Sequence, residues 1–242
     1  MTQPVAGGQA AASSVAAKPS RSLRRIALLH AGSMTAFLVT LVAMVFVVPV
    51  IFEGEEERRA AYDVAFTLLL LTGAAAVVEL RPMPLAAAVL CVVAIAIRWS
   101  EWLLPAGVST LAREGASLLA LLLLLSIVGV RVFAGGAVTA DRIMGAVALY
   151  LLLGIGWSVA YELVSVHVPG AFTGDTPGRG PDRWLYFSFV TLTTVGYGDI
   201  TPVARAARSL AALEALVGQL YPAIILARLV TLQGDAGERG GK

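Results

Sequence analysis

The stretch of sequence that decides the fold is Thr194-Val195-Gly196-Tyr197-Gly198-Asp199, which directly follows the apolar segment 184–193. A helix needs about 20 apolar residues to cross a membrane, so a segment of about ten is too short. We therefore expect a half-helix that enters the membrane from one side, with Asp182 as its N-cap. The C-terminal end of such a half-helix carries a partial negative charge, which favours a cation at the membrane midplane.

The backbone after this half-helix must be irregular and must lie at membrane depth. Such backbone is tolerated only where it is buried in protein or lines a water-filled path. Gly196 and Gly198 stand two residues apart, and glycine adopts left-handed dihedral angles at little cost. When such conformations alternate along the chain, successive carbonyls turn to the same side. The stretch therefore predicts a row of carbonyl oxygens that can replace the hydration shell of an ion.

The composition places this stretch in a multispan membrane protein. Of the 242 residues, 58% are apolar and 14% are charged, whereas a soluble domain has about 25% charged residues. The net charge of +2 gives no argument for a nucleic-acid partner, and the single Cys91 excludes an intrachain disulfide framework. The sequence contains no metal-ligand cluster, catalytic triad or nucleotide-binding loop, so we expect neither an enzyme nor a cofactor.

Hydropathy predicts six spans, and the third is the least clear because it must include Arg98 and Glu101 to reach spanning length. Trp99 and Trp102 in that segment suit the membrane interface. The first span is too long for a signal peptide, and no small-residue cleavage site follows it. The expected spans are residues 26–52, 60–80, 85–104, 115–133, 143–161 (extending as far as 168) and 209–230.

Positive charge before the first span favours an orientation with both termini in the cytoplasm. These residues are Lys18, Arg21, Arg24 and Arg25. The basic residues are nearly all arginine, which hints at a bacterial source, so we expect a multi-pass protein of the bacterial inner membrane. The lipid bilayer is then an obligatory partner.

Residues 194–199 resemble the signature of the potassium channel superfamily in all six positions, and Thr193 precedes them. The resemblance covers about residues 142–230, a pore module with a short helix and a loop between two full spans. It implies a selectivity filter that conducts K⁺ through a ring of backbone carbonyls. The ion-coordinating residues implied are Thr194, Val195, Gly196 and Tyr197, with the Thr194 hydroxyl closing the innermost site, and the supporting residues are Thr193, Gly198 and Asp199.

The same resemblance implies further roles around this filter. The Tyr197 ring would pack against the pore helix and hold the filter diameter. Some family members pair an acidic pore-helix residue with the aspartate after the filter, but this chain has Val190 at that position. Tyr186 and Tyr161 are the two candidates to replace it as the partner of Asp199.

One filter segment cannot surround an ion, whereas four chains around a central axis can. We therefore expect an all-α membrane protein with six transmembrane helices, a re-entrant pore helix and a filter loop, assembled as a homotetramer. Its expected parts are a disordered cytoplasmic tail (1–20), a four-helix membrane domain (21–133), a pore domain (138–231) and a short cytoplasmic tail (232–242).

The last span contains Gly218 and Pro222, one helical turn apart. Proline removes a backbone hydrogen bond, so this turn is either a gating hinge or a static kink, and the sequence does not choose between them. Helical spacing then places Gln219, Ala223 and Leu226 near the cavity. One turn before Gly218, Glu214 is a candidate structural carboxylate behind the pore helix; the alternatives are snorkelling to the interface or pairing with Arg208.

The fourth span is unlike the sensor helix of voltage-gated channels, because it has no charged residue between Glu114 and Arg131. Moving one charge through the membrane field supplies about 2.3 kcal/mol per 100 mV. Without such charges we expect little or no intrinsic voltage sensitivity. His167 at the outer end of the fifth span is either an external proton sensor or simply solvated.

Three functional hypotheses follow from these patterns. The first is a potassium-selective channel that conducts K⁺ passively. The second is a non-conducting or regulatory subunit that assembles with other channel chains. The third, a subunit of an ion-translocating transporter, is disfavoured because such proteins carry several degraded filter loops, whereas this chain has one intact loop.

Overall fold

The computed structural model describes residues 34–77, 84–103, 110–133, 139–174 and 182–240. Its long helices are an N-terminal helix (Met34–Ile51), α3 (Glu55–Val77), α4 (Pro84–Leu103), α5 (Thr110–Phe133), α6 (Ala140–His167) and α8 (Arg205–Gly240). A shorter helix, α7 (Asp182–Leu192), precedes residues 194–199, which are called the filter stretch below. Two short strands, β1 (Phe172–Gly174) and β2 (Ile200–Pro202), lie before α7 and after the filter stretch. The proposed tail 1–20 and the first residues of the first span lie outside the described residues.

Within the described residues, four helices are long and apolar enough to cross a membrane. These are the N-terminal helix, α5, α6 and the part of α8 that ends at Arg228. The other two expected spans, α3 and α4, are helices of 23 and 20 residues. Charged residues crowd the first turns of α3, and the apolar part of α4 that is described covers only Val89–Ser100. The chain is therefore a mostly helical, multi-pass membrane protein.

The N-terminal helix changes its hydrogen-bonding pattern because of Pro49. A π-helical stretch, Ala43–Val47, precedes the α-helical turn α2, Val48–Ile51. Proline has no N–H to donate, and its ring clashes with the carbonyl four residues earlier, here that of Val45. Widening the helix over one turn relieves this clash without ending the helix.

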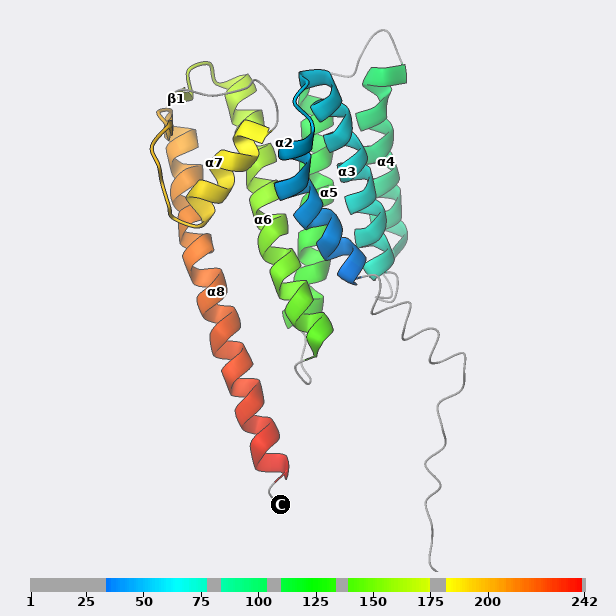
Figure 1. Cartoon of the computed structure of the whole chain (residues 1–242), viewed down its shortest axis with the longest axis vertical. Helices are drawn as coiled ribbons and strands as arrows, with labels where there is room; N and C mark the ends of the chain where they lie inside the picture. Colours follow the sequence, from blue (N-terminus) through cyan, green and yellow to red (C-terminus); the bar gives the residue numbers. More distant parts are fainter. Residues whose placement is uncertain (1–33, 78–83, 104–109, 134–138, 175–181, 241–242) are drawn as a thin grey trace, which may run out of the picture.

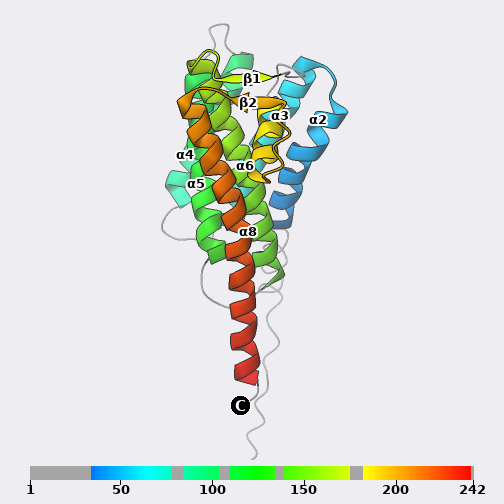
Figure 2. The same ribbon diagram turned by 90° about the vertical axis from the view of Figure 1, so that its left-hand side faces the viewer.

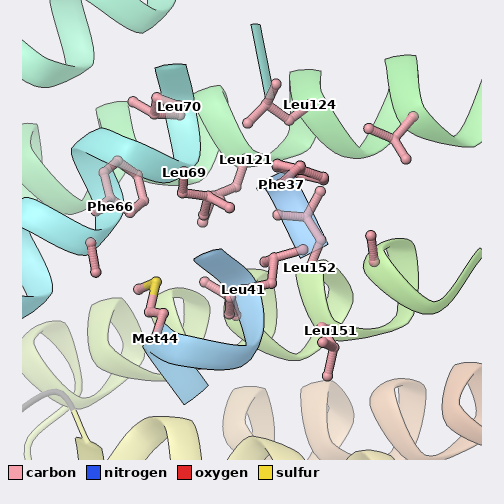
Figure 3. Packing of buried hydrophobic residues seen from close by; sticks show 14 of the residues in the cluster. Phe37, Leu41, Met44, Phe66, Leu69, Leu70, Leu121, Leu124, Leu151 and Leu152 are labelled. Atoms are coloured by element: carbon pink, nitrogen blue, oxygen red, sulfur yellow. The ribbon is translucent and has the colours of Figure 1, made fainter. Parts of the chain in front are cut away.

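The first helices form a bundle around large apolar side chains (Figure 3). Phe37 from the N-terminal helix, Leu69 from α3 and Leu124 from α5 are each at most 1% exposed. Gly73 of α3 lies opposite Phe37 and Leu124, and a Cβ at this position would lie 3.0 Å from each. Small residues that allow such close approach are typical of helix packing in membranes.

The C-terminal half of the chain is built on α6, which packs against α5 on one side and α7 on the other. Figures 1 and 2 show α7 wedged between α6 and α8 near one end of the molecule, with α8 on the outside. In the most apolar window of α8 only 11% of residues are buried, compared with 56% in α6. One face of the chain is therefore a long apolar helix with few partners of its own.

Two features of the chain from α6 to α8 differ from the sequence predictions. The strands β1 and β2 pair antiparallel, from Phe172 opposite Pro202 to Gly174 opposite Ile200, and no sequence pattern indicated them. The helix α8 continues to Gly240, so most of the expected tail 232–242 is helical. At 36 residues and 1.5 Å per residue, α8 is about 54 Å long, which is longer than a hydrocarbon core of about 30 Å. The described start of the N-terminal helix and the C-terminal end of α8 lie at the same end of the molecule (Figure 1).

Candidate functional site

The short helix α7 has 11 residues and carries the filter stretch at its C-terminal end. Its buried side chains face α6 and α8, and they include Trp184, Phe187, Ser188 and Leu192. Asp182, the predicted N-cap, is the first described residue of the helix. Its carboxylate forms an ion pair with Arg58 of α3 at 3.5 Å, which ties the start of α7 to the first bundle.

The backbone after α7 alternates between two conformations. Thr194, Gly196 and Gly198 have φ angles of +59°, +58° and +80°, while Val195 and Tyr197 between them do not have positive φ. Glycine adopts this region freely, but a residue with a Cβ pays about 1–2 kcal/mol for it. A threonine at positive φ is therefore held by its surroundings.

The last carbonyls of α7 hold this loop. The Thr194 N–H donates to the Thr191 carbonyl at 2.9 Å, and the N–H groups of Val195 and Gly196 both donate to the Val190 carbonyl at 3.0 and 3.2 Å. The last carbonyls of any helix have no intrahelical partner, so they are available for this purpose. The N–H groups of the loop thus point back to the helix that precedes it.

The other side of the loop lacks cover from its own chain. Val195 and Tyr197 are 53% and 73% exposed, and apart from the adjacent residues no atom lies within 4 Å of a Cβ built on Gly196 or Gly198. The resemblance implies that the Tyr197 ring packs against the helix before the loop. Within one chain this ring is mostly exposed instead.

At the outer end of the loop, Asp199 is bonded by Tyr186 of α7. A hydrogen bond to the Asp199 carboxylate, together with desolvation, raises the pKa of the Tyr186 hydroxyl to about 12. Of the two tyrosines considered for this role, Tyr186 is thus the one that bonds Asp199, while the Tyr161 hydroxyl donates to Glu214.

Glu214 is fully buried at the junction of three helices. Its carboxylate accepts hydrogen bonds from Ser188 of α7 and Tyr161 of α6, both at 2.5 Å. Ser188 also donates to the carbonyl of Gly154 in α6 at 2.8 Å. Arg208, the alternative partner, donates to a backbone carbonyl of β2. The carboxylate therefore lies at the contact of α7 with α6 and α8 and links the three helices.

Gly218 lies where α8 crosses the end of α7. A Cβ at this position would overlap the Leu192 carbonyl oxygen and lie 2.7 Å from its carbonyl carbon. The Tyr150 hydroxyl of α6 donates to the same carbonyl at 3.4 Å. Gly218 thus has a packing role at this crossing, and the helix continues through Pro222.

The residue after Gly218 reaches the filter stretch. Gln219 Nε2 donates to Thr194 Oγ1 at 2.8 Å. The other two candidate cavity residues, Ala223 and Leu226, have exposed side chains, and Leu226 lines an apolar cavity of about 310 Å³ between α6 and α8.

A cluster of charged side chains in the first bundle was missed by the sequence analysis. Arg98 Nε of α4 donates to Asp63 Oδ1 of α3 at 2.5 Å, with side chains 9% and 1% exposed. Arg98 Nη1 also donates to Ser117 at 3.4 Å, and Arg113 pairs with Glu114 at 2.7 Å. The signal in the sequence was one acidic residue, Asp63, and one basic residue, Arg98, in otherwise apolar segments. Charged side chains that are buried in a membrane protein must be paired.

No group of three or more His, Cys, Asp or Glu side chains in the described part of the chain could hold a metal ion. The backbone carbonyls of residues 194–197 and the Thr194 hydroxyl are hard oxygen ligands of the kind that suit an alkali-metal ion.

Comparisons with known proteins agree with this geometry. A protein family described as "Ion channel" matches residues 178–233, which contain α7, the filter stretch and most of α8. Protein LctB of Bacillus caldotenax is 36% identical over 107 residues, which cover 42% of this chain and 79% of LctB. Two pore potassium channel b of Oryza sativa subsp. japonica is 42% identical over 80 residues, covering 33% of this chain and 21% of that protein.

Two-pore potassium channel 1 of Arabidopsis thaliana is 36% identical over 87 residues, covering 36% of this chain and 22% of that protein. No solved structure matches the chain. The residues that match the family hold the short helix, the alternating backbone and most of the helix that crosses behind them. By these similarities, the chain belongs to the potassium channel superfamily.

Proposed function

We propose that this chain forms a homotetrameric, potassium-selective channel that conducts K⁺ passively, with little or no intrinsic voltage sensitivity. Thr194, Val195, Gly196 and Tyr197 supply the ion-coordinating oxygens, and Thr193, Gly198 and Asp199 support them. In this proposal six helices cross the membrane, α7 is the re-entrant pore helix, and both termini are cytoplasmic.

The observation that carries the proposal is the alternating backbone of the filter stretch. Positive φ at Thr194, Gly196 and Gly198, with the intervening residues outside that region, is what a row of carbonyls turned to one side requires. The N–H groups of Thr194, Val195 and Gly196 bond the end of α7, which leaves the carbonyls of the loop for an ion.

The uncovered surfaces support a tetramer around this loop. Tyr197 is 73% exposed, and α8 carries exposed apolar residues along its length, among them Leu213, Leu216, Leu220 and Ile224. Neighbouring copies around a four-fold axis would cover both. The same symmetry would bring four filter loops to one axis, where their carbonyls surround a cation.

The low voltage sensitivity rests on the charges of the first bundle. Arg98 is buried in an ion pair with Asp63, and the α5 residues between Glu114 and Arg131 are uncharged. A steep response needs several charges that cross the field, at about 2.3 kcal/mol per charge and 100 mV, and a single paired arginine does not supply them.

The test is ion flux from vesicles that contain the purified full-length chain. Vesicles loaded with K⁺ should release it when the chain is present, Na⁺-loaded vesicles should release much less, and Ba²⁺ should block the release. Gly196→Ala should abolish selective flux, because a Cβ at φ +58° costs about 1–2 kcal/mol at each of the filter positions around the axis.

Selective flux that survives Gly196→Ala unchanged would overturn the filter assignment. Absence of flux from a correctly assembled protein would favour the second hypothesis, a non-conducting or regulatory subunit. A steep activation curve with several charges in planar bilayers would refute the predicted voltage insensitivity.

A further inference from the structure

We infer that Gln219 is a positioning residue for the innermost ion site, because it fixes the direction of the Thr194 hydroxyl. This inference rests on the proposed function, since it concerns how one ligand of the proposed filter is held. The sequence predicted only that Gln219 lies near the cavity, and it gave this residue no role toward Thr194.

The contact joins the inner helix to the first residue of the filter. Gln219 Nε2 donates to Thr194 Oγ1 at 2.8 Å, a normal length for such a hydrogen bond. The two residues are 25 positions apart in the chain, and they come from α8 and from the loop after α7. Gly218, the residue before Gln219, lies directly against the Leu192 backbone at the end of α7. This close crossing of α8 and α7 brings Gln219 to Thr194.

The chemistry of a hydroxyl group makes this contact specific. A threonine Oγ1 has two lone pairs and one rotatable O–H. With Nε2 of Gln219 on one lone pair, the other lone pair is left for an ion, and the O–H must point away from both. The amide thus removes orientations in which the O–H proton faces the cation. Four such hydroxyls around an axis form a pre-organised ring of ligands.

The backbone of Thr194 adds a second reason for this support. Thr194 is the only described non-glycine residue with positive φ, and a β-branched side chain is unusual there. Its N–H is held by Thr191 at 2.9 Å, while its side chain is held by Gln219 from the opposite element. Removing the amide leaves the side chain of a strained residue without the hydrogen bond from α8.

The experiment measures block of K⁺ flux by Ba²⁺ in vesicles that contain wild-type protein or Gln219→Leu. Ba²⁺ has nearly the size of K⁺ and twice its charge, so its affinity responds strongly to the orientation of the site's oxygen ligands. Loss of one hydrogen bond at each of four positions should weaken Ba²⁺ block roughly tenfold, while the protein still assembles as a tetramer. Gln219→Met, which keeps the chain length without a donor, should behave in the same way.

A double-mutant cycle separates this role from a general effect on the cavity. In a Thr194→Ala background the hydroxyl is gone, so Gln219→Leu should change Ba²⁺ block less than twofold. Ser126→Ala in α5, whose hydroxyl donates to the Leu122 carbonyl of its own helix, should also leave the block unchanged. If Gln219→Leu weakens the block equally with and without the Thr194 hydroxyl, Gln219 acts on the cavity in another way and the inference is wrong.

The outcomes also distinguish this inference from the proposed function. A wild-type protein that assembles but carries no Ba²⁺-sensitive K⁺ flux would overturn the proposed function. A wild-type protein with normal flux and block, whose Gln219→Leu and Gln219→Met variants show the same block, would overturn the role of Gln219 alone.

Discussion

Replacement of Gly218 by alanine tests how closely α8 packs on the end of α7. The added Cβ would overlap the Leu192 carbonyl oxygen and lie 2.7 Å from the carbonyl carbon. Ordinary contact begins at 3.4 Å, so the two backbones must separate by at least 0.7 Å (3.4 minus 2.7). Neither partner is a flexible side chain that could rotate away.

The expected cost follows from two opposing effects. Overpacking costs about 1–3 kcal/mol, and the upper end applies here because backbone meets backbone. Alanine is better than glycine in a helix interior by about 1 kcal/mol. We therefore expect a net loss of about 2 kcal/mol per chain. A change of this size lowers the melting temperature of a chain of this length by about 4–8 °C.

The assay is thermal loss of the assembled protein in detergent, together with K⁺ flux from vesicles. Gly156→Ala is the matched control, because Gly156 lies in the neighbouring helix α6 and a Cβ there meets no atom within 4 Å. It lines a cavity of about 260 Å³ between α5 and α6, so the control should be neutral or stabilising. The reasoning fails if Gly218→Ala melts at the wild-type temperature and conducts normally.

Three further predictions address the ion, the buried carboxylate and the buried ion pair. Exchanging K⁺ for Na⁺ should lower the melting temperature of the wild-type protein, since an ion at 100 times its Kd stabilises the folded state by about 2.7 kcal/mol; equal melting in both salts would contradict K⁺ binding. Glu214→Ala should destabilise the protein by about 1–3 kcal/mol, because it removes the acceptor of the buried Tyr161 hydroxyl, and thermal melting that matches wild type would show that the bond is unimportant. Arg98→Leu should lower the free energy of unfolding by about 3–5 kcal/mol, because it removes the ion-pair partner of buried Asp63. The control is the partly exposed pair of Arg131 and Asp141. Removing that pair should lower the free energy of unfolding by less than about 1 kcal/mol.

Much of the fold could be predicted from the sequence because its signals are local. The segment before the filter stretch is too short to span, and the structure forms an 11-residue helix there. Gly196 and Gly198 are spaced for alternating dihedral angles, and both have positive φ. Long apolar runs predict helices, and α5 and α6 follow them closely, because backbone hydrogen bonds in a membrane must be satisfied within the helix.

Other features differed from the prediction because they depend on segments distant in the chain. The pairing of β1 with β2 joins segments on either side of α7, and strands of three residues have too few positions for a recognisable alternation. The ion pair of Asp182 with Arg58 of α3 likewise joins two segments that are distant in the chain.

The sequence by itself determined most of the long helices, the segment before residue 194 that is too short to span, and the position of the two glycines that follow it, since each of these depends on residues within a few positions of one another. Only the tertiary structure decided that Glu214 bonds Ser188 and Tyr161, that Gly218 meets Leu192, and that Gln219 reaches Thr194. The physical reason is that apolar residues are spread around α6 and α8 with no one-sided pattern, so periodicity does not reveal which face of each helix meets a neighbour. The rotation and crossing of packed helices choose those partners, and the chain's local pattern does not contain that information.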